Sequence, residues 1–293
     1  MEFAFPVKRR IGLRIVIGVV LISVSVTAWA LYDKERLGGW LYQWALRLNA
    51  RVLADPATAP PLETAHTVRH FRTVVRFATG TSWAAKALDQ IGRLAMAQHR
   101  YAEAREVFEP LCTVYYQYRD VCMMSRIYIG RCYEAEGDVE AAAHTYADME
   151  QFHPWTPLWI EAPIYSALLY EHHGQRAQAM AAYRQAIQVY LRRLRVAPPY
   201  AMDRLQWQLV EAYEGVEAWS DAVQVLEEAL AAGDPTFQVK RPEMWYKFGR
   251  LFEERLRQPQ KALAAYQQLI KEFPDHALTL QAMESIKRLA ASQ

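Results

Sequence analysis

Apolar residues recur every three to four positions through most of this chain, from Leu62 to its end. Such spacing places them on one face of an α-helix, and no convincing alternation of the kind typical of strands interrupts it. Gly, Pro and short polar turns break the pattern at intervals, as they do between successive helices. The pattern therefore predicts an all-α fold for residues 62–293.

The amino-terminal part has a different pattern. Four basic residues within the first fourteen precede an uncharged apolar run at residues 15–32, close to the ~20 residues that cross a bilayer core. We expect a cytoplasmic segment at residues 1–10 and one transmembrane helix at 11–32. A signal peptide shares the basic start and apolar run, so cleavage and secretion are the alternative.

Aromatic residues crowd the end of this run. Trp29, Tyr32, Trp40 and Trp44 are predicted to lie at the membrane interface, where indole and phenol rings favour the headgroup layer. We interpret residues 33–61 as an amphipathic interfacial helix followed by a Pro/Ala-rich linker. The alternative is a helix packed on the first repeat.

Basic residues flank the apolar run on both sides, so the positive-inside rule gives only a weak preference for the orientation. We predict a single-pass inner-membrane protein with a cytoplasmic amino terminus and a periplasmic carboxy-terminal domain. The alternative places that domain in the cytoplasm, as an adaptor of an envelope assembly machine.

A repeated pattern organises the domain: a small residue and an aromatic on one helix, a turn, then an alanine followed four residues later by a large apolar residue. The copies contain, in order, Gly92 with Ala104 and Phe108; Gly130 with Ala142 and Tyr146; Gly174 with Ala179 and Tyr183; Ala212 with Ala222 and Leu226; and Gly249 with Ala262 and Tyr266. The fifth copy carries one extra residue in its turn, RLRQPQ.

These copies resemble tetratricopeptide repeats, whose signature combines the same small, aromatic and alanine positions over ~34 residues. The resemblance implies a right-handed superhelical solenoid of helical hairpins that holds other proteins. We place a half-repeat at 62–80, five repeats at about 84–274 and a capping helix at 277–290. The phrases RFATGTSWAAKAL and IKEFPDHALTLQAMESI also resemble the inter-repeat joints of bacterial envelope proteins.

Composition adds few chemical candidates. With 34 Lys/Arg against 32 Asp/Glu, the net charge near +2 gives no reason to expect nucleic acid as a partner. Neither a phosphate-binding glycine loop nor a nucleophile elbow occurs in the sequence, so we expect no enzyme activity, no cofactor and no metal. The enzyme alternative requires an active site assembled from distant residues. Cys112 and Cys122 are a possible disulfide, and Cys132 completes the three cysteines.

A partner-binding groove is the remaining prediction, because the first helix of each hairpin lines the concave face in the family that the chain resembles. Arginine and aromatic side chains suit a peptide ligand, since guanidinium groups bind carboxylates and rings supply rigid contact area. The candidate residues are Arg93, Ile127, Arg131, Leu168, Arg204, Trp207, Tyr246 and Arg250. We expect one or more protein partners in a membrane-associated complex, with the bilayer contacted through the amino-terminal helix.

Overall fold

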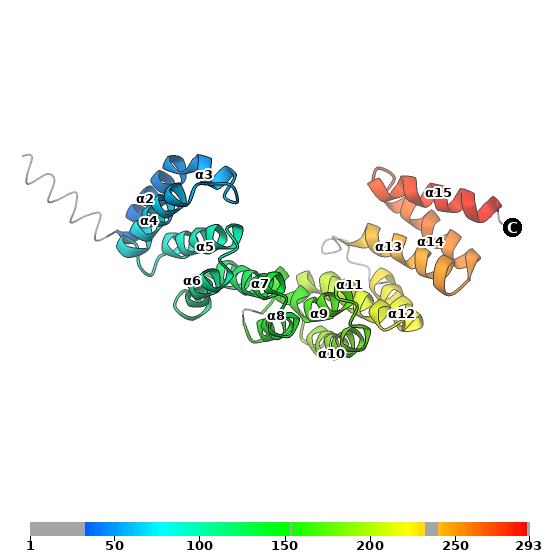
Figure 1. Ribbon diagram of the computed structural model, residues 1–293. Coiled ribbons are helices and arrows are strands. Elements are labelled where there is room, and N and C mark those ends of the chain that lie inside the picture. Colours follow the sequence, from blue (N-terminus) through cyan, green and yellow to red (C-terminus); the bar gives the residue numbers. More distant parts are fainter. Residues whose placement is uncertain (1–32, 153, 232–239, 292–293) are drawn as a thin grey trace, which may run out of the picture. The chain divides into compact units, whose positions relative to one another are not determined.

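The computed structural model describes residues 33–152, 154–231 and 240–291, and every regular element within them is a helix (Figure 1). The chain divides into two compact units, unit 1 at residues 1–132 and unit 2 at residues 133–293. Each unit has a core of its own, built from helices that follow one another in the sequence. The predicted all-helical class, with helices paired into successive hairpins, is confirmed for these residues.

Unit 1 contains six helices among its described residues. They are α2 (Lys34–Leu48), α3 (Ala50–Ala54), α4 (Pro61–Phe77), α5 (Ser82–Ala97), α6 (Tyr101–Thr113) and α7 (Arg119–Glu136), the last of which runs past the division at residue 132. Consecutive helices pack in pairs, with α4 on α5 and α5 on α6.

Unit 2 continues with hairpins of the same kind. Its described elements are α8 (Val139–Ala147), the 3-10 turn η1 (Asp148–Gln151), α9 (Pro157–His172), α10 (Arg176–Leu194), α11 (Pro199–Gly215), α12 (Trp219–Ala231), α13 (Arg241–Arg250), the π-helical turn η3 (Leu251–Arg255), α14 (Pro259–Glu272) and α15 (Ala277–Ala291). The first helices of neighbouring hairpins contact each other, as α9 does with α11.

Local sequence explains where many helices begin and turn. Pro61, Pro157, Pro199 and Pro259 each occupy a first helical position, where the missing N–H costs no hydrogen bond. Gly174 has a positive φ of 69° in the turn between α9 and α10, a conformation that disfavours other residues.

Small residues let aromatic rings seat between paired helices. A Cβ on Gly249 would lie 2.5 Å from Cε1 of Tyr266, and one on Gly92 would collide with the ring of Phe108. The ring therefore occupies the space that a larger residue would fill, at close-packed density. This contact is the physical basis of the small and aromatic positions that define the sequence repeat.

The folded domain begins earlier than the expected Leu62. Tyr42 and Ala45 of α2 are buried, and a Cβ on Gly38 would lie 2.7 Å from Cβ of Ala78. Helix α2 thus packs on α4 and α5, and residues 33–54 belong to unit 1 instead of standing outside it. The predicted half-repeat at 62–80 is the second helix of a hairpin that α2 begins. Apolar residues occur on both faces of α2, so periodicity alone did not identify the buried one.

The predicted cytoplasmic segment and transmembrane helix at residues 1–32 lie outside the described part of the chain. Among the residues described, no helix combines the length and apolar character needed to span a membrane.

The extra residue in the fifth repeat is accommodated by the π-helical turn η3. There the amide of Leu256 donates to the carbonyl of Leu251 at 3.0 Å, a spacing of five residues instead of four. A single inserted residue typically widens one helical turn in this way. The hairpin therefore retains the contact between Gly249 and Tyr266.

Candidate functional site: a groove in unit 2

Two adjoining hollows form a groove on unit 2. The larger has a volume of about 930 Å³ and is lined by residues of α9, α10, α11 and α13, and the smaller, of about 270 Å³, lies between α11, α13, η3 and α15. Glu214, Lys247 and Arg255 line both hollows and so mark where they meet. The larger is the size of a typical ligand site.

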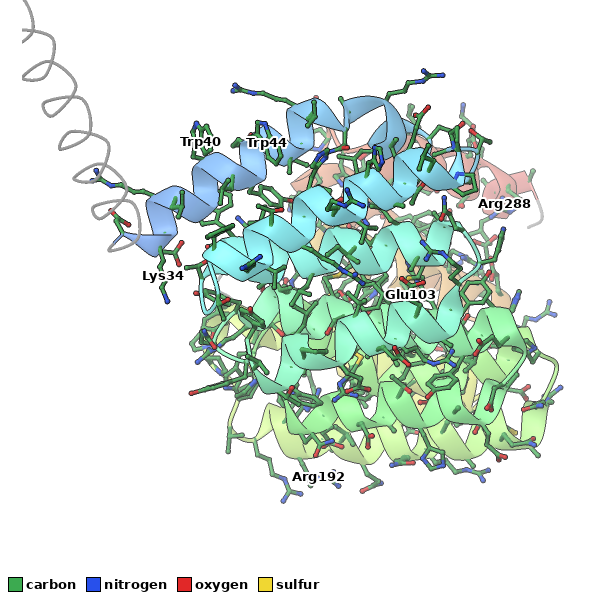
Figure 2. All side chains as sticks on the ribbon, turned by 60° about the vertical axis from the view of Figure 1, so that its left-hand side comes forward. Lys34, Trp40, Trp44, Glu103, Arg192 and Arg288 are labelled. Carbon is green, nitrogen blue, oxygen red and sulfur yellow. A yellow bond between two sulfur atoms is a disulfide. The ribbon has the colours of Figure 1, made fainter. Side chains whose placement is uncertain are left out.

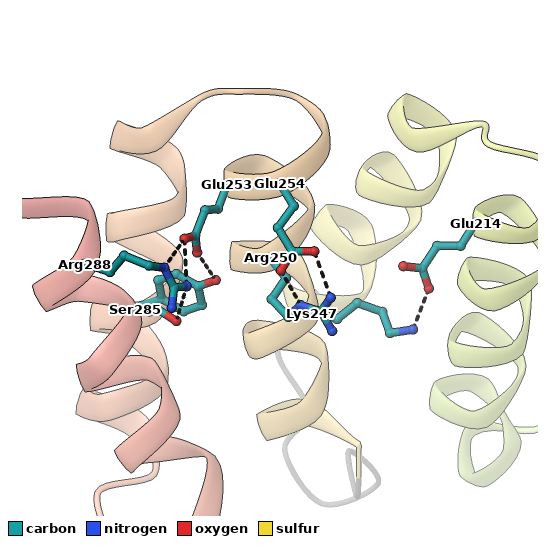
Figure 3. A network of polar contacts seen from close by, with 8 residues as sticks. Glu214, Lys247, Arg250, Glu253, Glu254, Ser285 and Arg288 are labelled. Atoms are coloured by element: carbon teal, nitrogen blue, oxygen red, sulfur yellow. Dashed lines mark hydrogen bonds and ion pairs between the residues drawn. The ribbon is translucent and has the colours of Figure 1, made fainter. Parts of the chain in front are cut away.

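A tyrosine–glutamate hydrogen bond recurs inside the hairpins of unit 2. The hydroxyl of Tyr183 donates to Glu171 at 2.6 Å and that of Tyr266 donates to Glu253 at 2.8 Å. Tyr146 bonds Glu134 in the same way. In each hairpin the glutamate lies near the end of the first helix, and its tyrosine partner lies in the second helix. The bond holds each carboxylate against its own repeat, and Glu253 also accepts from Arg288 of α15 at 3.0 and 2.7 Å (Figure 3).

The fourth hairpin lacks this tyrosine. Leu226 occupies the equivalent position, twelve residues after Glu214. Glu214 instead accepts from Nζ of Lys247, on the next hairpin, at 2.5 Å (Figure 3). The carboxylate of Glu214 is thereby directed into the groove.

Lys247 is surrounded by three groups, and together these four residues form the Lys247 node. Its Nζ lies 2.5 Å from Glu214 and 3.9 Å from Glu211, and 4.4 Å from the ring centroid of Trp207. Burial raises the pKa of Glu211, and the Lys247 ammonium partly opposes this. The indole face favours the cation as well. The node places two carboxylates, one cation and one aromatic ring at the meeting point of the hollows.

Further ion pairs line the groove. Arg250 donates two hydrogen bonds to Glu254, at 2.9 and 2.8 Å, on the same helical face (Figure 3). This bonding raises the pKa of Arg250 and lowers that of Glu254. Arg176 and Glu217, which both line the larger hollow, are bonded at 2.5 Å. Positive and negative groups alternate, so the surface suits a ligand that itself carries both charge and apolar side chains.

The structure brings four of the predicted groove residues to these hollows. Leu168 lines the larger one, whereas Trp207, Tyr246 and Arg250 line the smaller. Arg204 lies on α11 with its guanidinium 3.7 Å from Glu161, outside the lining of both hollows.

The other three predicted groove residues belong to unit 1. Arg93 lies 3.9 Å from Asp89, and Arg131 is exposed. Ile127 is a correction, because only 7% of it is exposed and it belongs to the core. Helix α7 is apolar on more than one side, which conceals its buried face from a periodicity argument.

Lys247, Glu211 and Tyr183 were missing from the prediction although they line the groove. The signal that was present is the constant spacing of twelve residues between Glu134 and Tyr146 and between Glu171 and Tyr183. Twelve residues after Glu214 the chain has Leu226 instead of a tyrosine, and this carboxylate bonds outside its own hairpin. Which cation replaces the tyrosine depends on the neighbouring hairpin and is not encoded in local sequence.

The remaining candidates lie elsewhere. Sγ of Cys112 and Sγ of Cys122 are 2.04 Å apart in a disulfide that joins the end of α6 to the start of α7, and Cys132 is buried. Trp40 and Trp44 are exposed on α2, whereas Trp29 and Tyr32 lie outside the described residues. No group of three metal-ligating side chains occurs in the described part of the chain.

The stacked hairpins and their groove define a helical-repeat protein. Family models for the tetratricopeptide repeat match residues 90–154, 164–190 and 243–276, so the chain contains tetratricopeptide repeats. These matches cover the first, second, third and fifth predicted copies in whole or part. No curated protein sequence matches the chain significantly.

Several solved structures are similar to parts of this chain. Human IFIT1, a dimer bound to m7Gppp-AAAA, is 16% identical with a TM-score of 0.48 over 86% of this chain and 53% of its own. TTC0263, a thermophilic repeat protein of Thermus thermophilus, is 20% identical with a TM-score of 0.44 over 69% and 99%. The chain spans about half the length of IFIT1.

Proposed function

We propose that this tetratricopeptide repeat protein is a membrane-anchored scaffold, and that the groove of unit 2 binds a segment of a partner protein. The observation that carries the proposal is the Lys247 node, where Glu214 leaves the bonding pattern of its own repeat and faces the groove. Such a surface acts by binding, and we propose no catalytic role for it.

The ligand that fits best is an extended or helical peptide with aromatic and charged residues. Trp207 and Tyr246 supply rigid contact area in the smaller hollow, and Arg250 carries a guanidinium at its edge. Aromatic and arginine residues at the centre of an interface contribute most of its affinity. A peptide carboxylate would compete with Glu254 for Arg250, and a peptide cation would compete with Lys247 for Glu214.

Capture of the partner tests the groove. The full chain is purified in mild detergent with its companions, and the stoichiometric protein is identified by mass spectrometry. Trp207→Ala should weaken capture by about thirtyfold, the effect of removing an interface residue worth about 2 kcal/mol. Arg250→Ala should also weaken capture, because it removes the guanidinium that would bind a peptide carboxylate. The fold should be retained, since the pair of Arg250 with Glu254, four residues away, contributes little to stability.

Arg204→Ala is the matched control, because Arg204 lies on the same helix as Trp207 but outside the lining. The circular dichroism spectrum of each variant verifies the fold. Capture that is equal for Trp207→Ala, Arg250→Ala and the control would place the site on another face.

We further propose that the repeat domain lies in the periplasm of a bacterial envelope. The uncharged run at 15–32 behind a basic start supports the anchor, and the disulfide between Cys112 and Cys122 supports an oxidising compartment. Protease digestion of spheroplasts should remove the domain while intact cells protect it. Digestion only after the inner membrane is opened would favour the cytoplasmic adaptor instead, and recovery of the domain without the apolar run would favour the secreted form.

A further inference from the structure

Helix α2 carries apolar residues on two opposite faces. Gly38, Tyr42 and Ala45 are buried against α4 and α5. The opposite face exposes Trp40, which points away from the packed helices in Figure 2, and part of Trp44, whose ring meets that of His70 on α4 edge-on at 4.9 Å. The buried face explains how α2 joins the fold, and it leaves the second face unexplained.

The exposed face forms a continuous stripe, which we call the α2 stripe. Its apolar members are Trp40, Trp44 and Leu48, with 67%, 37% and 57% of their surfaces exposed. Gln43 and Arg47 are the exposed polar members on α2, at spacings of three and four residues from the apolar ones, and the exposed Arg51 follows in α3. Clustered exposed apolar residues of this kind mark an interaction surface.

Charge distinguishes the region around the stripe. Residues 33–77 contain seven Lys/Arg and four Asp/Glu, whereas the whole chain has 34 and 32. Of the acids, Glu35 is engaged by the amide and hydroxyl of Ser82 and by the Tyr118 hydroxyl. The region around the stripe therefore carries a net positive charge, which suits an anionic partner.

Chain continuity indicates which anionic surface lies near. The apolar run at 15–32, predicted to span the bilayer, ends one residue before Asp33, the N-cap of α2. Glu35 fixes the start of α2 to the α4–α5 turn at Ser82. Trp40 follows Asp33 by only about 10 Å of helix, at ~1.5 Å per residue. A bilayer that holds the run would be within reach of the stripe.

We infer that the α2 stripe docks on the surface of an anionic bilayer. The indoles of Trp40 and Trp44 enter the headgroup layer, and Arg47 and Arg51 bind lipid phosphates. Aromatic rings favour this layer, and each basic residue near it contributes about 1 kcal/mol. This inference rests on the membrane anchor of the proposed function. It adds that unit 1 is held against the membrane along α2.

Photocrosslinking in the full chain tests the inference. A benzophenone amino acid replaces Trp40, or Leu280 of α15 as a control whose 69% exposure matches that of Trp40. Each protein is reconstituted into nanodiscs of phosphatidylglycerol that carry a traceable alkyne lipid. We expect strong lipid adducts at position 40 and background at position 280. Equal yields at the two positions would overturn the inference, as would adducts to another protein or to a second copy of the chain.

Charge reversal provides the second arm. In the position-40 background, Arg47→Glu with Arg51→Glu should lower the lipid adduct in phosphatidylglycerol by at least about fivefold, the factor that about 1 kcal/mol gives. The adduct in phosphatidylcholine should change little. An unchanged adduct in phosphatidylglycerol would overturn the role of the arginines.

Carbonate extraction of the same membranes reports on the anchor alone. A chain that resists carbonate but gives no lipid adduct at position 40 retains the proposed function and refutes the docking of α2. A chain released by carbonate refutes the anchor, and adducts at position 40 then decide docking by themselves.

Discussion

Asp89 gives a sensitive test of how α2 packs on unit 1. Its carboxyl lies on α5 close to Tyr42 of α2, and burial raises its pKa from 3.8 to about 6. The Arg93 guanidinium, 3.9 Å away, opposes this shift only in part, since its side chain is 53% exposed. A shift of about 2 units corresponds to about 3 kcal/mol, an upper bound on the cost of ionising Asp89 in the folded state.

The direction of the pH effect follows from the raised pKa. Between about pH 4 and pH 6 the folded state retains the proton of Asp89 while the unfolded chain has lost it. The contribution of Asp89 to the free energy of unfolding is therefore greatest below about pH 4, falls as the pH rises, and levels off above about pH 6. Asp89→Asn, which removes the ionisation, should stabilise unit 1 at pH 7.5 by about 1–3 kcal/mol.

Urea unfolding of the two proteins, followed by circular dichroism at pH 4.5, 6 and 7.5, measures this difference. The advantage of Asp89→Asn should shrink steadily as the pH falls. Glu106→Gln, at an exposed position of α6, controls for the general effect of removing a negative charge. A variant less stable than the wild type at pH 7.5, or an advantage independent of pH, would refute the buried environment assigned to Asp89.

Variants at three further positions probe the packing of each unit by urea unfolding. Arg193 is buried with its guanidinium 3.3 Å from the ring centroid of Trp159, and burial lowers its pKa to about 10. Arg193→Met should change the free energy of unfolding by less than about 1.5 kcal/mol, whereas Arg193→Ala should lower it by about 2–4 kcal/mol because the packed stem of the side chain is lost. Equal losses for the two variants would contradict this. Gly249→Ala should cost about 1–3 kcal/mol, because its Cβ would lie 2.5 Å from Tyr266; a neutral result would mean that the ring shifts freely. Cys112→Ser should destabilise the chain by about 2–3 kcal/mol under oxidising conditions and have little effect in reductant; an effect that persists in reductant would indicate lost packing instead.

The hairpins could be predicted from the sequence because their main contacts are local. Gly249 and Tyr266 are seventeen residues apart, and Gly92 and Phe108 make the same contact at a spacing of sixteen. Helix α2 was harder, because Trp40 and Tyr42 give it two apolar faces and periodicity does not choose between them. The choice depends on α4 and α5, which supply the complementary surface.

The groove was only partly predictable for a related reason. Trp207, Tyr246 and Arg250 face it because their positions follow from the phase of their own helices. Lys247 and Glu211 enter the site through an ion pair between different hairpins. That pairing depends on how neighbouring repeats stack, which no single repeat encodes.

Leu226 also affects how the fourth and fifth repeats hold together. The carboxylates of Glu134 and Glu171 bond a tyrosine of their own hairpin, and Glu253 bonds both its own Tyr266 and Arg288 of α15. Glu214 has no such tyrosine and bonds Lys247 of the next hairpin. The contact between these repeats therefore includes an ion pair, which salt weakens and which a competing cation on a ligand would break. Binding of a partner in the groove and the stability of the contact between the two repeats would then be thermodynamically linked. A partner whose cation binds Glu214 would also weaken the contact between the fourth and fifth repeats.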